Sequence, residues 1–194
     1  MPAPKSALVA GDSIYLRRPR RSDAARFVAA VRDSARLHRN WVQAPSTPAR
    51  FAKYLARFAA AASRRATSAT HVGLLACRSA DHVPVGVFNL SEIVRGAFRS
   101  TYLGYYALAP HDGRGYMAEG LALVLRFAFG PMKLHRVEIN IQPANLRSIA
   151  LARRAGFLRE GFSRRYVKLG GRWRDHERWA LTVEDWRAAR ARRR

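Results

Sequence analysis

Two glycines, Gly113 and Gly115, stand where a strand-like segment gives way to an apolar, helix-like one. Glycine tolerates positive φ and lets a ligand come close to the backbone. The first N–H groups of a helix have no internal partners and lie at the positive end of its dipole. The pair therefore predicts an anion site suited to a pyrophosphate, although an ordinary turn would use the same glycines. The loop lacks the lysine of a P-loop and the longer dinucleotide fingerprint, which disfavours ATP and NAD.

A second polar pair, Asn145 and Ser148, lies three residues apart just after another strand-like segment. At this spacing both side chains share one face of the first helical turn. They could contact a ligand held between this helix and the glycine loop. Capping of the helix by Asn145 is the other interpretation, because asparagine is a preferred N-cap residue.

The elements that must position these residues are expected from hydrophobic periodicity. Strands are predicted over residues 13–18, 71–78, 83–92, 100–108, 136–142, 158–169 and 174–181, and helices over 24–36, 48–65, 116–129 and 146–155. The tail over 184–194 is a short helix or frayed. We expect one α+β domain with a mixed sheet of six or seven strands.

The charge balance is extreme, with 36 lysines and arginines against 13 acidic residues and a net charge of +23. GC-rich codons would explain the choice of arginine over lysine, but not the net charge, because acidic residues could have balanced it. A field of this sign attracts polyanions such as CoA, nucleic acid or the ribosome.

Other features exclude several classes of protein. The single cysteine, Cys77, cannot form an internal disulfide, and Asp175 with His176 lacks the spacing of a metal site. No apolar run approaches the roughly 20 residues that span a bilayer, and the patch over 7–10 is too short for a signal peptide. We expect a cytoplasmic protein without a metal or a membrane span.

Four motifs in order resemble the GCN5-related N-acetyltransferase (GNAT) superfamily. They are a strand followed by GRGYMAE, an apolar helix, a strand followed by N-x-x-S, and the pair Gly156–Phe157. The stretches YLGYYALAPHDGRGYMAEGL and GGRWRDHERWAL resemble ribosomal-protein-alanine acetyltransferases of the RimJ/RimL type, and GVFNLSEIVRGAF resembles the RimJ branch. The resemblance covers roughly residues 14–186, followed by a basic tail over 187–194. It implies a GNAT fold with a mixed, mostly antiparallel sheet, about four helices and a splay at the cofactor cleft, with acetyl-CoA as co-substrate.

The resemblance also implies roles for individual residues. The pantetheine arm would pair with the end of the strand, at Tyr106, Ala107 and Leu108. The pyrophosphate would bind the amides of the loop, at Gly113, Arg114, Gly115, Tyr116, Met117 and Ala118. Asn145 would contact the cofactor, and Ser148 would protonate the leaving thiolate. Ala152 stands where many members carry a tyrosine general acid, so Ser148 becomes the leading candidate acid. Pro110 lies one residue later than is usual, and Met117 replaces a smaller residue.

The general base and the acceptor site are less defined. Glu92 and Glu138 are candidate bases, and surface or sheet carboxylates are the alternative interpretation. Trp41, Trp173 and Asn89 are candidate acceptor contacts, and packing against the sheet edge is the other interpretation of the two tryptophans. The amine would attack the thioester directly, since an N-terminal amine with a pKa near 8 is partly neutral at cellular pH.

Three functions remain open at this point. The first is acetylation of a protein N-terminal amine, for example that of a ribosomal protein, by a monomer or homodimer whose basic surface contacts the ribosome or rRNA. The second is acetylation of a small amine such as an antibiotic, polyamine or amino acid. The third is a basic RNA-binding protein with a degenerate cofactor fold.

Overall fold

The computed structural model describes residues 4–59 and 69–192. Within this part, eight strands form one sheet in the order β1-β2-β3-β4-β5-β6-β8-β7. Their bounds are β1 Val9–Ala10, β2 Ile14–Arg17, β3 Val72–Arg78, β4 Pro84–Val94, β5 Ser100–Ala107, β6 Arg136–Ile141, β7 Leu158–Leu169 and β8 Arg172–Thr182. Only β5 and β6 pair in parallel; the other neighbours are antiparallel. The expected mixed, mostly antiparallel α+β fold is confirmed.

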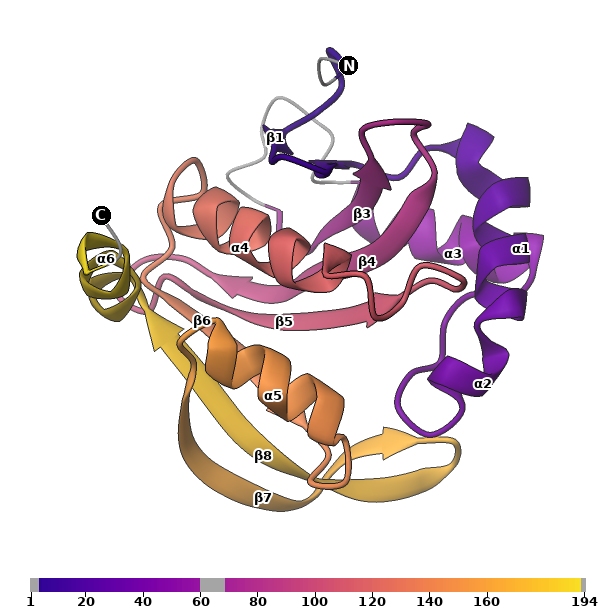
Figure 1. Ribbon diagram of the computed structural model, residues 1–194. Helices are drawn as coiled ribbons and strands as arrows, with labels where there is room; N and C mark the ends of the chain where they lie inside the picture. The colour runs from indigo at the N-terminus through magenta and orange to yellow at the C-terminus, as the bar shows by residue number, and fades with distance from the viewer. Residues whose placement is uncertain (1–3, 60–68, 193–194) are drawn as a thin grey trace.

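Helices cover both faces of the sheet (Figure 1). The described α-helices are α1 Ala24–Asp33, α2 Ala35–His38, α3 Pro48–Phe58, α4 Tyr116–Phe129, α5 Leu146–Arg154 and α6 Val183–Ala191, and a 3-10 turn, η1, spans Arg21–Asp23. Residues of α1 and α3 share a buried cluster with one face of β2, β3 and β4. Residues of α4 and α5 share a second, larger cluster with the opposite face.

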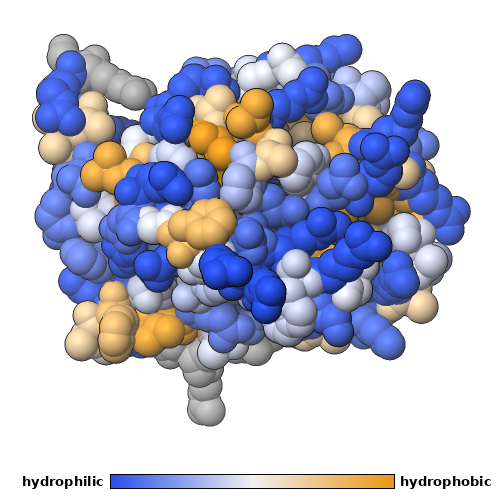
Figure 2. Space-filling model, turned by 90° about the horizontal axis from the view of Figure 1, so that it is seen from below, coloured by the Kyte–Doolittle hydropathy of each residue, from blue (hydrophilic) through white to orange (hydrophobic). Residues whose placement is uncertain are grey.

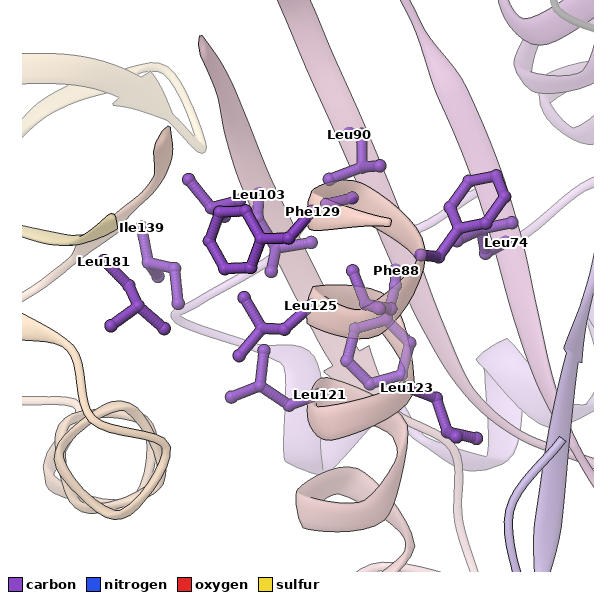
Figure 3. Packing of buried hydrophobic residues seen from close by; sticks show 14 of the residues in the cluster. Leu74, Phe88, Leu90, Leu103, Leu121, Leu123, Leu125, Phe129, Ile139 and Leu181 are labelled. Carbon is purple, nitrogen blue, oxygen red and sulfur yellow. The ribbon is translucent and has the colours of Figure 1, made fainter. Parts of the chain in front are cut away.

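The larger core forms because α4 is apolar on nearly every side. Leu121, Leu125 and Phe129 lie against strand residues that include Phe88 and Leu103 (Figure 3). All five side chains are at most 6% exposed. Burying side chains of this size contributes about 1.5–3 kcal/mol each. The position of the α4 N-terminus over the sheet is therefore fixed by its packing.

The sheet opens between β5 and β6. Their parallel pairing is confined to three residue pairs, which run from Ser100–Arg136 to Tyr102–Glu138. Beyond Tyr102 the two strands diverge between α4 and α5 (Figure 1), while β5 stays paired with β4 up to Ala107. The splay expected at the cofactor cleft is therefore present, at the half of β5 that leads into the glycine loop.

Several boundaries differ from the sequence expectation. The eighth strand, β1, is too short to show an alternating pattern. The helix expected over 24–36 breaks at Ser34, whose hydroxyl bonds the Ala30 carbonyl and accepts the Ala109 amide. The helix expected over 48–65 ends at Phe58 in the described residues, and 60–65 lie outside them. No helix in the described part of the chain has both the length and the apolar character needed to cross a bilayer.

Candidate active site

The loop between β5 and α4 presents a run of unpaired amides. Within the described residues, no hydrogen bond engages the backbone N–H groups from Asp112 to Met117, and the first engaged amide of α4 is that of Ala118. Gly113 and Gly115 have φ of 77° and 84°, and a Cβ added to either would meet nothing within 4 Å. The loop is therefore exposed and offers free N–H donors at the positive end of a helix, which suits a phosphate.

Several arginine side chains and one histidine nitrogen without a hydrogen-bond partner surround this loop. The His111 Nδ1 atom is buried without a hydrogen-bond partner among the described residues. Burial, together with Arg78 and Arg114, lowers the pKa of His111. Arg147, largely exposed at the start of α5, lies 3.8 Å from the Asp112 carboxylate. An anion bound here would meet positive groups from three parts of the chain.

Ser148 lies at the cleft together with a tyrosine that the sequence reasoning missed. Its Oγ is 2.7 Å from the Tyr105 hydroxyl, which comes from the splayed half of β5. Burial raises the pKa of Tyr105 to about 12, and the bond with Ser148 lowers it only in part. The phenol therefore keeps its proton at neutral pH and can donate either to the Ser148 carbonyl, 3.3 Å away, or to Ser148 Oγ, which could itself be the donor of the 2.7 Å bond. Asn145 takes the capping role, since its Oδ1 accepts the Ser148 amide at 3.2 Å.

The three residues predicted to face pantetheine differ in their availability. The Leu108 amide donates to the Val85 carbonyl, and its side chain is fully buried. The Ala107 carbonyl bonds His38 Nε2 at 2.8 Å, and because a carbonyl can only accept, Nε2 carries the proton. The Tyr106 hydroxyl is buried without a partner among the described residues. Of the three side chains, that of Tyr106 alone ends in a polar atom, and this atom has no partner among the described residues.

The α1–α3 side of the splay carries a second set of polar groups. Asn89 on β4 accepts a 2.9 Å bond from the Tyr54 hydroxyl of α3. Its neighbour across the β4–β5 ladder is Gly104, where an added Cβ would meet nothing within 4 Å. On β6, the Asn140 Oδ1 is buried without a partner among the described residues. Asn140 alternates with Ile139 and its apolar partners on the other face, so its side chain points to the same side as Tyr106.

The two candidate bases lie at the closed end of the splay. Glu92 sits at a bulge in β4 with φ of 49°, is mostly exposed, and is 3.4 Å from His71 Nε2. Its neighbour Ser91 pairs with Tyr102, five residues before Ala107, which is about 16 Å along the strand. Glu138 also lies level with Tyr102 and bonds Arg136 Nε at 3.0 Å. Both candidates therefore lie near the level of Tyr102, three residues or about 10 Å along β5 from Tyr105, and their role as the base stays a prediction.

The two tryptophans come from the segments that flank the open side. Trp173, on β8 near the β7–β8 turn, is 59% exposed. Trp41 is partly buried in the loop after α2, and the adjacent Asn40 carbonyl accepts a 2.9 Å bond from Gln142 Nε2 at the end of β6. In Figure 1 both the α2 loop and the β7–β8 hairpin lie at the open end of the splay. Cys77 is buried in the smaller core, the cluster that also contains Leu108.

No group of three or more potential metal ligands occurs among the described residues.

The remaining features are a free-amide loop, a parallel pair of strands that diverges beside it, and a serine on the next helix. Comparison with known proteins gives this arrangement a family. The sequence profile described as "Acetyltransferase (GNAT) domain" matches residues 13–158, three quarters of the chain. The chain belongs to this GNAT family.

Individual GNAT relatives sharpen the comparison. The chain is 41% identical over 106 residues to the Escherichia coli (strain K12) "[Ribosomal protein uS5]-alanine N-acetyltransferase", and 37% identical over 115 residues to the Bacillus subtilis "Probable N-acetyltransferase YjcK". These matches cover 55% and 59% of this chain. They span only 55% and 62% of the relatives' own lengths.

Solved structures agree with this fold over more of the chain. Mycobacterium smegmatis RimJ, described in complex with CoA-disulfide, superposes with a TM-score of 0.80 at 26% identity, over 89% of this chain and 83% of that one. The ribosomal-protein-S5-alanine acetyltransferase of Vibrio fischeri has a TM-score of 0.79 at 20% identity, over 91% and 97%. The RimJ/RimL resemblance and the GNAT fold expected from the motifs are confirmed.

Proposed function

We propose that this protein is an acetyl-CoA-dependent N-acetyltransferase whose acceptor is the α-amine of a protein N-terminus, with ribosomal proteins as the leading class. The observation that carries the proposal is the run of unpaired amides from Asp112 to Met117, which lies at the end of the splayed β5. A pyrophosphate at these amides would direct the rest of the cofactor toward the gap between β5 and β6.

The residues present fit acetyl-CoA. The loop amides and the cations Arg114 and Arg147 suit its phosphates, and the unpaired His111 Nδ1 offers a further polar contact. Beyond Tyr102, the edge of β5 that faces β6 is free to pair with an amide-containing arm. When bound, acetyl-CoA supplies an activated thioester carbonyl.

Proton delivery falls to Ser148 and Tyr105. We infer that the Ser148 hydroxyl donates its proton to the leaving sulfur and regains one from water, which also takes the proton that the attacking amine loses. The Tyr105 hydroxyl would hold Ser148 Oγ in place through their 2.7 Å hydrogen bond. The raised pKa of Tyr105, about 12, keeps that donor protonated throughout the working pH range. This arrangement would fill the role left open at Ala152, which is fully buried and has no polar group.

A protein N-terminus is favoured over a polyamine by charge. A polyamine carries several positive charges, and a chain of net charge +23 would repel it. The similarity to the uS5-alanine acetyltransferase also supports a terminal amine. The unpaired Tyr106 hydroxyl and Asn140 Oδ1 would hold the amine and the first peptide group at the splay.

The test is to incubate the purified protein with acetyl-CoA and a panel of N-terminal peptides, spermidine and amino acids, and to read product masses. We expect a gain of one acetyl group on the α-amine of peptides. Acetylation confined to small amines would contradict the acceptor assignment. Absence of any product, together with no thermal shift at millimolar acetyl-CoA, would contradict the enzyme assignment.

A further inference from the structure

A groove of about 790 Å³ lies between α1, α2, the 39–46 loop and α3. Five basic side chains line it, and no aspartate or glutamate does: the cations are Arg32, Arg39, Arg50, Lys53 and Arg57. All five residues are exposed to solvent. The charged side chains of the groove therefore all have one sign, on a molecule whose surface is largely hydrophilic in the view of Figure 2.

Acidic residues are few around these cations: Asp33 follows Arg32 in the sequence, and Arg57 bonds His71, which lies 3.4 Å from Glu92. The sequence from Ser34 to Ala80 contains no acidic residue. Among the described residues, none of the five cations takes part in an ion pair. The side chains of Arg39, Arg50 and Lys53 also make no hydrogen bond there, whereas Arg32 Nε donates to the Ser46 carbonyl. A preference for arginine codons does not produce a surface from which carboxylates are missing.

Two residues connect the groove to the splay. His38 lines the groove and donates to the carbonyl of Ala107, the last residue of β5. Tyr54 also lines the groove and donates to Asn89, which pairs with Gly104 in the β4–β5 ladder. A chain that leaves the open end of β5 on this side of the sheet would pass these two side chains and enter the groove.

The cations of α3 are spaced to follow an extended chain. Arg50, Lys53 and Arg57 stand at positions i, i+3 and i+7, which places them along one face of the helix. Seven residues of helix rise about 10 Å, which matches about three residues of extended peptide. Acidic side chains at successive or alternate residues of an extended peptide could therefore each lie near one of these three cations.

We propose that this groove binds acidic residues that follow the N-terminal residue of the acceptor, so that the enzyme selects protein N-termini with a run of Asp or Glu. The inference rests on the proposed function, since it assigns the acceptor chemistry of that same site. Single-stranded RNA would match the charge but needs exposed aromatic faces for base stacking. The groove offers only His38, which is buried, and Tyr54, which is partly buried and hydrogen-bonded.

The test compares two peptides that begin with alanine, one with three glutamates at its third to fifth positions and one with glutamines there. With acetyl-CoA and wild-type protein, we expect kcat/KM for the glutamate peptide to exceed that for the glutamine peptide about tenfold. Tenfold corresponds to about 1.4 kcal/mol, or about 0.5 kcal/mol for each of three partly screened ion pairs. The preference should fall as salt is raised from about 50 to 500 mM.

The variant R39Q/R50Q/K53Q should bring the ratio of the two kcat/KM values close to one. The matched control is Arg26→Gln, an exposed cation of α1 outside the groove, which should keep the wild-type ratio.

Equal wild-type rates on both peptides, or a ratio that survives in the triple variant, would overturn the groove assignment and leave the acetyltransferase assignment intact. Absence of transfer to either peptide with the wild-type protein would contradict the proposed function, and the groove assignment with it. Inhibition by a short RNA that the triple variant abolishes, without any peptide preference, would assign the groove to RNA and overturn the proposal.

Discussion

Replacement of Tyr105 by phenylalanine tests the proton path in detail. The substitution removes one hydroxyl that lies 2.7 Å from Ser148 Oγ and leaves the buried ring in place. A hydrogen bond of this kind contributes about 1 kcal/mol, so kcat should fall about fivefold. Ser148→Ala should lower kcat about 100-fold, at the low end of the range for a general acid. KM for acetyl-CoA should change little in either variant, because neither hydroxyl is placed at the phosphates.

The double variant decides whether the two hydroxyls act as one unit. If Tyr105 acts through Ser148, the double variant should be no slower than Ser148→Ala alone. The matched control is Tyr15→Phe, which removes a hydroxyl that lies 3.0 Å from His82 Nδ1. Tyr15 is on β2, which is separated from β5 by β3 and β4. It should leave kcat unchanged. Steady-state kinetics with an acceptor peptide compare the four variants with the wild type. Full activity in Ser148→Ala, or strictly additive losses in the double variant, would refute the pathway.

Further predictions concern stability. Ser34→Ala should lower the free energy of unfolding by about 1–3 kcal/mol, because the partly buried Ala109 amide loses its acceptor. Urea denaturation measures this, and an unchanged midpoint would contradict it. Asp23→Asn should destabilise the protein at pH 7 much more than at pH 3. Burial opposes ionisation of Asp23, but hydrogen bonds from Arg17 and the Arg20 amide leave its pKa below the ordinary value. A lowered pKa adds stability that is present above about pH 4 and lost as the pH falls through the folded pKa. Equal destabilisation at both pH values, measured by thermal unfolding, would contradict this assignment.

Local signals explain what the sequence could predict. The alternation that gave seven strands and the apolar run of α4 are properties of neighbouring residues, and both reappear in the structure. The glycines at 113 and 115 adopt positive φ as their residue type suggested. The Gly170–Gly171 turn likewise has both φ values positive and joins β7 to β8. In each case a short segment contains the whole reason for its conformation.

The parts that escaped prediction depend on contacts between distant segments. Tyr105 meets Ser148 across 43 residues, and His38 meets Ala107 across 69, so no spacing rule could pair them. The break at Ser34 depends on the Ala109 amide, 75 residues away. The role of Glu92 stays a prediction: the structure places it at a bulge of β4, near the level at which β5 and β6 pair.

The central claim is that the amides of residues 112–117 bind the phosphates of the cofactor. Calorimetric titration of CoA into the wild type, Gly115→Glu and Gly115→Ala tests it most directly. The alanine carries the same backbone strain at φ of 84° and adds a methyl group to open space, so it should bind CoA within about tenfold of the wild type. The glutamate should weaken binding on the order of 100-fold or more through like-charge repulsion. Equal affinities in the alanine and glutamate variants would contradict the placement of the phosphates at this loop.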